Sequence, residues 1–404
     1  MFSFHLFAAL LRYDIMCARE VIQKRGNTAM KIKDFGVEIH MNAYENDCTY
    51  NLAETCVSSM TLAELMELTE GKEKILSEIV GLRLSYGHIE GSPDFKRNIA
   101  SLYKSANEKN IVTTHGAIGA NHLVLQTLVE PGDETISILP TYQQLYSIPE
   151  SVEANVRILP LSAENKFLPD LELLAEYMTD KVRIVCINNP NNPSGSVMDR
   201  EYLEKIVEIV NPYGAYILCD EVYRGLTHEG DNLTASIFDL YDKGVSTSSM
   251  SKVFSLAGLR LGWIVAPEDV IERVNRHRDY NTISCGVIDD YLAALALKHK
   301  DKIFARSLEI VRNNLKILDD WINSEPNFSY TKPKGGTTAF LKLNLDMPSE
   351  EFCQRLLKET GVLLVPGAAF DMEGYVRIGY AYEPVLLKTG LEKISEFAKE
   401  LNKS

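Results

Sequence analysis

Short apolar runs alternate with amphipathic stretches along the middle of this chain, from about Leu76 to Gly286. Strands of a parallel sheet are buried on both faces and are joined by helices, so they appear as continuous apolar runs between segments of helical periodicity. The clearest strand candidates are ETISILP, VRIVCINN and AYILCD, and the clearest helices are ANHLVLQTLVE and DREYLEKIVEIV. The pattern predicts an α/β fold, with a large domain whose mostly parallel, doubly wound sheet is covered by helices.

The chain changes character on either side of that region. After residue 290, two long amphipathic helices precede several short apolar segments, which predicts a smaller α+β domain over residues 287–404. Residues 30–75 show no sheet of their own, and we expect them to complete this smaller domain, leaving residues 76–286 as the large one. Residues 1–29 contain one apolar run without a basic start, and Met30 opens a typical enzyme beginning, so residues 1–29 are interpreted as an upstream extension.

Composition restricts the partners of the chain. The 404 residues carry a formal net charge of −14 at pH 7, which opposes non-specific binding to nucleic acid or to an anionic membrane. The apolar run near the start is too short to span a bilayer, so no membrane association is expected. The 7 cysteines include no CxxC pair and are odd in number, which suits a reducing compartment and predicts a cytoplasmic protein.

The most specific segment is SMSKVFSLAGLRLG, residues 249–262. Most lysines lie on the surface, but Lys252 stands among small and apolar residues, where desolvation is expected to lower its pKa. A desolvated lysine is a nucleophilic amine that forms Schiff bases with carbonyl compounds. Arg260 follows in a turn bracketed by glycines and carries a group that binds phosphate well.

Every position of this segment matches the pyridoxal-phosphate attachment signature of the class I and II aminotransferases. The chain resembles that family, of fold type I, from about residue 30 onward. The resemblance implies pyridoxal 5'-phosphate as the cofactor, held by Lys252 as an internal aldimine. It also implies that the Ser249 hydroxyl and the Arg260 guanidinium bind the cofactor phosphate.

Two turns that follow strand candidates carry further residues. AYILCDEVY places Asp220 at the carboxyl end of a strand, where ligands bind in open α/β sheets. The resemblance implies that Asp220 keeps the pyridine nitrogen protonated and that Tyr223 bonds the ring phenolate, although an acid at a strand end also caps helices. Asn192, in CINNPNNPSG, matches the asparagine that contacts the ring oxygen beside the substrate, whereas the turn alone predicts only a rigid loop.

Three segments are similar to the family's remaining cofactor contacts. In THGAIGANHL a glycine turn opens a helix, so the amides of Gly116, Ala117 and Ile118 would face an anion, although helix packing explains such a turn equally well. Tyr142 matches the aromatic that stacks on the cofactor ring, or is a core tyrosine. Tyr86 matches the residue that reaches the phosphate of the neighbouring subunit, which implies a homodimer with shared active sites.

Substrate contacts are implied at two places. Arg377, in YVRIGYA, resembles the arginine that binds the substrate α-carboxylate. In YNLAETCVSS the family usually has a glycine and then a proline where the backbone closes over the substrate, and here Ala53 and Thr55 occupy those positions. We hypothesise that Glu54, between them, contacts a cationic or polar group of the substrate.

No metal ion is expected at these motifs. His88 and His115 flank two of them, but neither has a second histidine or a carboxylate at ligand spacing. We expect both to be satisfied by local hydrogen bonds.

These residues predict an aminotransferase that moves the α-amino group of an L-amino acid to a 2-oxo acid with ping-pong kinetics. A C–S β-lyase, a decarboxylase or a cyclising biosynthetic enzyme stays open, because the attachment motif does not decide which bond breaks. A catalytically silent binding module is the alternative outside catalysis, and the retained lysine and the lack of a basic helix-turn-helix argue against it. The sequence identifies neither the amino donor nor the acceptor.

Overall fold

The computed structural model describes residues 32–401, and the residues from Asp34 onward form one unit. The predicted upstream extension, residues 1–29, lies outside the described range, as does Cys17. Between residues 32 and 401, no helix is both long and apolar enough to cross a membrane.

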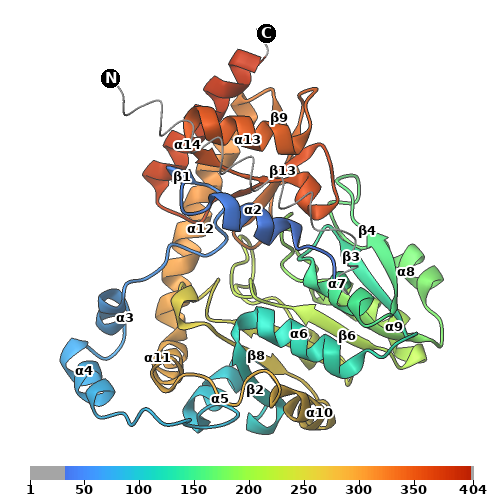
Figure 1. Ribbon diagram of the computed structural model, residues 1–404, viewed down its shortest axis with the longest axis vertical. Coiled ribbons are helices and arrows are strands. Elements are labelled where there is room, and N and C mark those ends of the chain that lie inside the picture. Colours follow the sequence, from blue (N-terminus) through green and yellow to red (C-terminus); the bar gives the residue numbers. More distant parts are fainter. Residues whose placement is uncertain (1–31, 402–404) are drawn as a thin grey trace, which may run out of the picture. The chain divides into compact units, whose positions relative to one another are not determined.

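A seven-stranded sheet forms the larger layer of this unit (Figure 1). Its strands are β2 (Ile111–His115), β3 (Glu134–Leu139), β4 (Asn155–Pro160), β5 (Val182–Asn188), β6 (Tyr216–Asp220), β7 (Gly244–Ser249) and β8 (Leu261–Val265). Their order is β2-β8-β7-β6-β5-β3-β4, and only β8 runs antiparallel to its neighbours. The predicted α/β class is confirmed, and the three apolar runs noted above are β3, β5 and β6.

Helices cover both faces of this sheet. They are α5 (Pro93–Ala100), α6 (Gly116–Leu128), α7 (Gln144–Ser151), α8 (Leu171–Tyr177), α9 (Arg200–Val210), α10 (Glu268–Arg278) and α11 (Val287–Lys298). Successive side chains of a strand point to opposite faces. In β5, Ile184 and Cys186 therefore join the core with α6 and α10, whereas Val185 and Ile187 join the core with α8 and α9.

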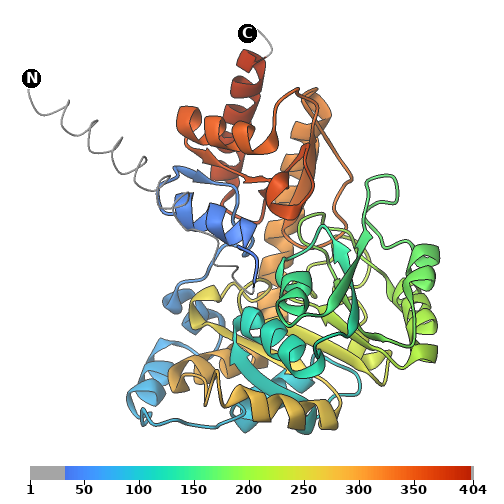
Figure 2. The same ribbon diagram turned by 45° about the vertical axis from the view of Figure 1, so that its right-hand side comes forward.

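A second, four-stranded antiparallel sheet has the order β12-β13-β10-β9. Its strands are β9 (Phe328–Tyr330), β10 (Thr338–Leu343), β12 (Val365–Pro366) and β13 (Tyr375–Gly379). The helices of this region are α12 (Lys300–Ser324), α13 (Ser349–Thr360) and α14 (Pro384–Leu401). α12, in orange, runs from the side of the large sheet to the small one (Figure 2). The domain boundaries expected at residues 76 and 287 stay predictions.

The N-terminal part of the unit connects the two sheets. It contains α2 (Gly36–Tyr44), β1 (Tyr50–Asn51), α3 (Leu62–Leu68) and α4 (Lys72–Val80), and β1 pairs in parallel with β11 (Val362–Leu363). Gly379 N donates to Leu52 O at 2.7 Å, and Val57 N donates to Lys252 O at 3.4 Å. Residues 52–57 therefore run from the small sheet to the loop that follows β7.

Candidate active site

A cavity of about 360 Å³ lies where β5, β6 and β7 end, at Asn188, Asp220 and Ser249. Parallel strands bring their carboxyl ends to one edge of a sheet, and α2, residues 53–56, the start of α6 and β13 complete the walls. Gly116 and Tyr86 are the predicted site residues that do not line the cavity. The others do: Ala53, Ala117, Ile118, Tyr142, Asn192, Asp220, Tyr223, Ser249, Lys252, Arg260 and Arg377.

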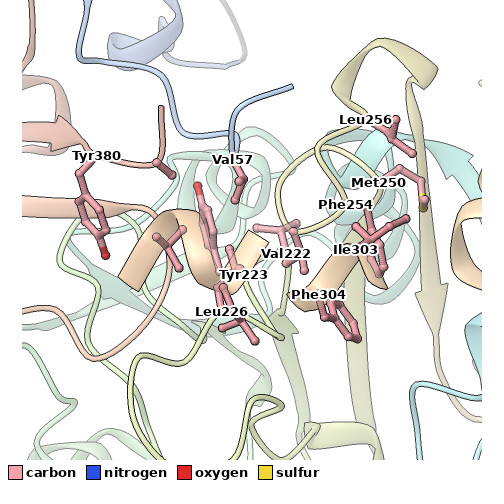
Figure 3. Packing of buried hydrophobic residues seen from close by; sticks show 14 of the residues in the cluster. Val57, Val222, Tyr223, Leu226, Met250, Phe254, Leu256, Ile303, Phe304 and Tyr380 are labelled. Atoms are coloured by element: carbon pink, nitrogen blue, oxygen red, sulfur yellow. The ribbon is translucent and has the colours of Figure 1, made fainter. Parts of the chain in front are cut away.

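Apolar packing fixes the loop that carries Lys252. Met250, Phe254 and Leu256 flank the lysine and are buried in one cluster with Ile303 and Phe304 of α12 (Figure 3). The rings of Phe254 and Phe304 have centroids 5.3 Å apart. Alternation of apolar anchors with small residues thus holds the loop against α12.

Lys252 itself is held by the segment that follows β1. Its Nζ donates a hydrogen bond to Thr55 Oγ1 at 2.6 Å and lies 3.7 Å from Cys56 Sγ. Burial lowers the pKa of Lys252, but the charges of Cys56, Tyr223 and Glu54 raise it more, and the net pKa lies above the ordinary lysine value. The expectation of a lowered pKa is therefore wrong, because nearby acidic groups outweigh desolvation. A raised pKa favours the ammonium form, which must lose a proton before it forms a Schiff base.

Asp220 is buried at the end of β6, and its two oxygens have different partners. Asn121 Nδ2 donates to Oδ2 at 2.7 Å, and Val222 N donates to Oδ1 at 3.1 Å. Thr247 Oγ1 donates to Asn121 Oδ1 at 2.6 Å, which orients that amide. Burial raises the pKa of Asp220 in spite of these bonds. Sequence reasoning missed Asn121, although its polar side chain stands out in the apolar sequence of α6.

Aromatic and amide side chains surround the same space. Tyr223 is 2% exposed, and Tyr142 OH donates to Glu38 Oε1 at 2.7 Å. Asn192 N donates to Asn188 Oδ1 at 2.6 Å, so the last residue of β5 fixes the turn that presents Asn192. Sequence reasoning did not single out Asn188 or Glu38. Together these groups can stack on a planar ring and form hydrogen bonds to its edge.

Cationic and amide donors gather at the N-terminus of α6. Ser249 and Arg260 line the cavity there beside Ala117 and Ile118. The first turn of α6 contains no acidic residue, and the dipole of a helix favours an anion at that end. A Cβ on Gly116 would lie 3.2 Å from Arg260 Nη2, so glycine leaves room for the guanidinium. This set of donors fits a phosphate group.

Arg377, on β13, is a buried cation that lines the cavity. It is 3% exposed, its Nη1 donates to Asn192 Oδ1 at 3.2 Å, and its Nη2 donates to Ala53 O at 2.9 Å. Among the residues that the structure describes, none accepts a hydrogen bond from its Nε. Burial lowers the pKa of Arg377. A carboxylate is the group that would satisfy this guanidinium.

The segment where the sequence departs from the resembled family forms one wall. Glu54 Oε1 accepts hydrogen bonds from the backbone amides of the next two residues, at 2.6 and 2.7 Å. Burial raises the pKa of Glu54, but the charge of Lys252 and these amide bonds outweigh it, and the net pKa lies below the ordinary value. Thr55, noted in the sequence only as a departure, supplies the hydroxyl that accepts from Lys252.

Tyr86 lies apart from the other predicted site residues. It is 70% exposed, between α4 and α5, and does not line the cavity. Within one copy of the chain it therefore has no contact with the site.

The chain is similar to proteins of one family over most of its length. The family model for aminotransferase class I and II matches residues 51–394. A capreomycidine synthase from Streptomyces vinaceus is 35% identical over 307 residues, which are 76% of this chain and 79% of that protein. An aspartate aminotransferase from Pyrococcus horikoshii is 30% identical over 324 residues, which are 78% of this chain and 81% of that protein. The crystal structure of a PLP-dependent aminotransferase from Streptococcus suis is 48% identical, with a TM-score of 0.90, and covers 93% of this chain and 100% of its own.

Proposed function

The chain belongs to the aminotransferase class I and II family, and from this premise we propose that it transfers the α-amino group of an L-amino acid to a 2-oxo acid. Its cofactor is pyridoxal 5'-phosphate. The observation that carries the proposal is the meeting of Lys252, Asp220 and Arg377 in one cavity, although three separate elements supply them.

The residues present fit that cofactor. Ser249, Arg260 and the first amides of α6 would hold its phosphate, and Tyr142 would flank its ring. Asp220 would face the pyridine nitrogen, and a protonated nitrogen there would favour the carboxylate against the burial that raises the pKa of Asp220. When bound, the cofactor supplies an electron sink for bond cleavage at the substrate α-carbon.

The side chains of the protein would bind the substrate and move the proton. Arg377 lines the cavity and would bind the α-carboxylate with its guanidinium, which the bonds of Nη1 to Asn192 and of Nη2 to Ala53 hold in place. Lys252, once a free amine, would take the α-proton as general base and later return it. Thr55 Oγ1 would hold the lysine Nζ near its present place. The same residues would serve both half-reactions, which predicts ping-pong kinetics.

The visible spectrum of the purified holoenzyme tests this proposal. Each of a panel of L-amino acids is added without any oxo acid. We expect the absorption of the lysine-bound cofactor to bleach with some donors while about one equivalent of oxo acid per site is released, as a ping-pong half-reaction requires. A 2-oxo acid should restore the band, and Lys252→Ala should lose both band and reaction. Kinetics that require a ternary complex would contradict transamination.

A second candidate is a cyclising, decarboxylating or C–S-cleaving enzyme on the same fold. The similarity that points to it is the 35% identity to a capreomycidine synthase, against 48% identity to the PLP-dependent aminotransferase from Streptococcus suis. Such enzymes regenerate the starting cofactor in each cycle. Continuous formation of pyruvate, carbon dioxide or a cyclised product without bleaching would favour this candidate over transamination.

We further propose a cytoplasmic homodimer with shared active sites. Tyr86 is exposed, and so are Val80, Leu84 and Ile89 in the same stretch of chain. A second copy would cover these apolar groups, and Tyr86 would then contribute to the phosphate site of that copy. The cytoplasmic location is supported by the odd number of cysteines.

A further inference from the structure

Three carboxylates line the cavity on the side of α2. Glu38 and Glu45 face it together with Val37 and Met41, as expected for positions that share one face of a helix. Glu54 joins them from the segment that follows β1. Helix α2 and the segment that follows β1 thus place acidic groups on one wall.

The charge of Lys252 acts on Glu54 and Glu45 and favours their ionised forms, but in the described part of the chain neither of these carboxylates nor Glu38 forms a direct ion pair. Glu38 accepts from Tyr142, and Glu54 accepts from two backbone amides. Burial raises the pKa of Glu45, and the charges of Glu54 and Glu38 raise it further, so the three are close enough to repel one another. A bound cation would relieve this repulsion.

Arg377 independently points to a ligand in the same cavity. Its side chain is 3% exposed, and its Nε has no hydrogen-bond partner within residues 32–401. Because Arg377 also lines the cavity, the α-carboxylate of an amino acid could pair with its guanidinium. The other charged residues of the wall outside the acidic cluster, Asp220, Lys252 and Arg260, have roles toward the cofactor in the proposed function. Of the charged groups that line the cavity, only the carboxylates of Glu38, Glu45 and Glu54 then remain to bind a charged side chain of the substrate.

We propose that the amino-acid substrate carries a second cationic group, an ammonium or a guanidinium on its side chain, which Glu38, Glu45 and Glu54 bind. This inference rests on the proposed function, because it assigns the side-chain end of the same site. A neutral side chain would leave the carboxylates unbalanced, and an acidic one would be repelled. Dicarboxylic amino acids are therefore excluded as the preferred donors.

Spectral titration of the holoenzyme with matched ligands tests the inference. L-Citrulline has the shape of L-arginine but an uncharged urea, and L-norleucine lacks the ammonium of L-lysine. Dissociation constants come from the initial shift of the cofactor absorption band, recorded before the half-reaction bleaches it. We expect the cationic member of at least one pair to bind about tenfold more tightly or better, the size of a hydrogen bond to a charged group.

Two variants assign the preference to the carboxylates. Glu54→Gln keeps an oxygen for the backbone amides, and in both Glu54→Gln and Glu45→Gln the side chain keeps its size, so neither change leaves a gap in the packing. Each should lower the cationic preference by about three- to tenfold. Glu208→Gln, exposed on α9 and away from the cavity, changes the net charge equally and should leave the preference as it is.

The outcomes separate this inference from the proposed function. Equal affinity for cationic and neutral ligands, with normal band shifts, would overturn the inference and leave the function intact. Absence of a band shift with every amino acid would overturn the function itself. A cationic preference that survives both Glu→Gln changes would show that the carboxylates do not bind the cation.

Discussion

The charge of each group in the cavity depends on its contacts more than on its residue type. Asp220 would be an ordinary acid on the surface, but burial raises its pKa, and Asn121 and the amide of Val222 fix the direction of its oxygens. Such a carboxylate is poised to pair with one cationic atom placed opposite. The proposed role of Asp220, pairing with the protonated pyridine nitrogen of the cofactor, therefore depends on the negative charge of this one carboxylate.

Removal of that charge gives the first prediction. Asp220→Asn should still bind the cofactor through Lys252 and the phosphate donors, but the rate of α-proton exchange should fall by about 10²-fold or more. The absorption band and hydrogen–deuterium exchange of the substrate report the two effects separately. Asp346→Asn, at an exposed position outside the cavity, is the matched control. Wild-type exchange in Asp220→Asn would refute the role of this residue.

Glu54 gives a prediction about pH. Its folded pKa is lower than its ordinary value, so the charged form stabilises the fold above the unfolded pKa of about 4.3, and this contribution is lost as pH falls through the folded pKa. The free energy of unfolding of wild type minus that of Glu54→Gln should thus be positive at pH 7 and shrink toward pH 4. Urea denaturation at both pH values measures it. A difference independent of pH would contradict the predicted pKa direction.

At the scale of secondary structure, the phosphate end of the site depends on how closely the start of α6 approaches β8. A Cβ on Gly262 would collide with the backbone of Gly116 and Ala117. Glycine at this point of β8 therefore lets the amides of α6 reach the cavity edge beside Arg260. Helix and strand act as one unit in presenting the donors.

Gly262→Ala should separate these two elements. We expect the free energy of unfolding to fall by about 1–3 kcal/mol, as for other overpacked sites, and the affinity for the cofactor to fall at least about tenfold as the helix amides move away. Gly258→Ala serves as control, because a Cβ there has nothing within 4 Å. Unchanged cofactor affinity in a folded Gly262→Ala protein would show that the helix terminus does not bind the phosphate.

One apolar run shows that the sequence of a segment does not predict which strands it pairs with. VLLVPG is one continuous apolar run in the sequence, yet the structure divides it between β11, which pairs with β1, and β12, which pairs with β13. Both short strands are buried, so apolar character predicts burial correctly. The choice of partner strand depends on distant segments, which periodicity within the run does not encode.

At the scale of the whole molecule, the cavity exists because two sheets face it. The large sheet supplies Asp220 and the loop of Lys252, whereas the small sheet supplies Arg377. The segment 52–57 is bonded to both, through Gly379 and Lys252. Relative movement of the sheets would therefore change the substrate contacts and the lysine contacts together.

Tyr86 provides the prediction at this scale. If two copies share their sites, the protein should sediment as a dimer, and Tyr86→Phe should weaken cofactor binding by about tenfold through loss of one hydrogen bond to a charged group. Tyr280→Phe, at a 95% exposed tyrosine, is the control. The shared site would be contradicted if the protein is a monomer and its Tyr86→Phe variant binds the cofactor as tightly as the wild type.

The sequence alone determined the α/β class and the chemistry of single motifs, because these depend on local periodicity and on residue spacing within one loop. The apolar runs predicted β3, β5 and β6, and the segment 249–262 predicted the family. Only the tertiary structure brought Thr55 to Lys252, 197 positions away, and Asn121 to Asp220, 99 positions away. It also reversed the expected pKa direction of Lys252. Such contacts join residues from different elements, and electrostatic effects follow distance in space and not along the chain.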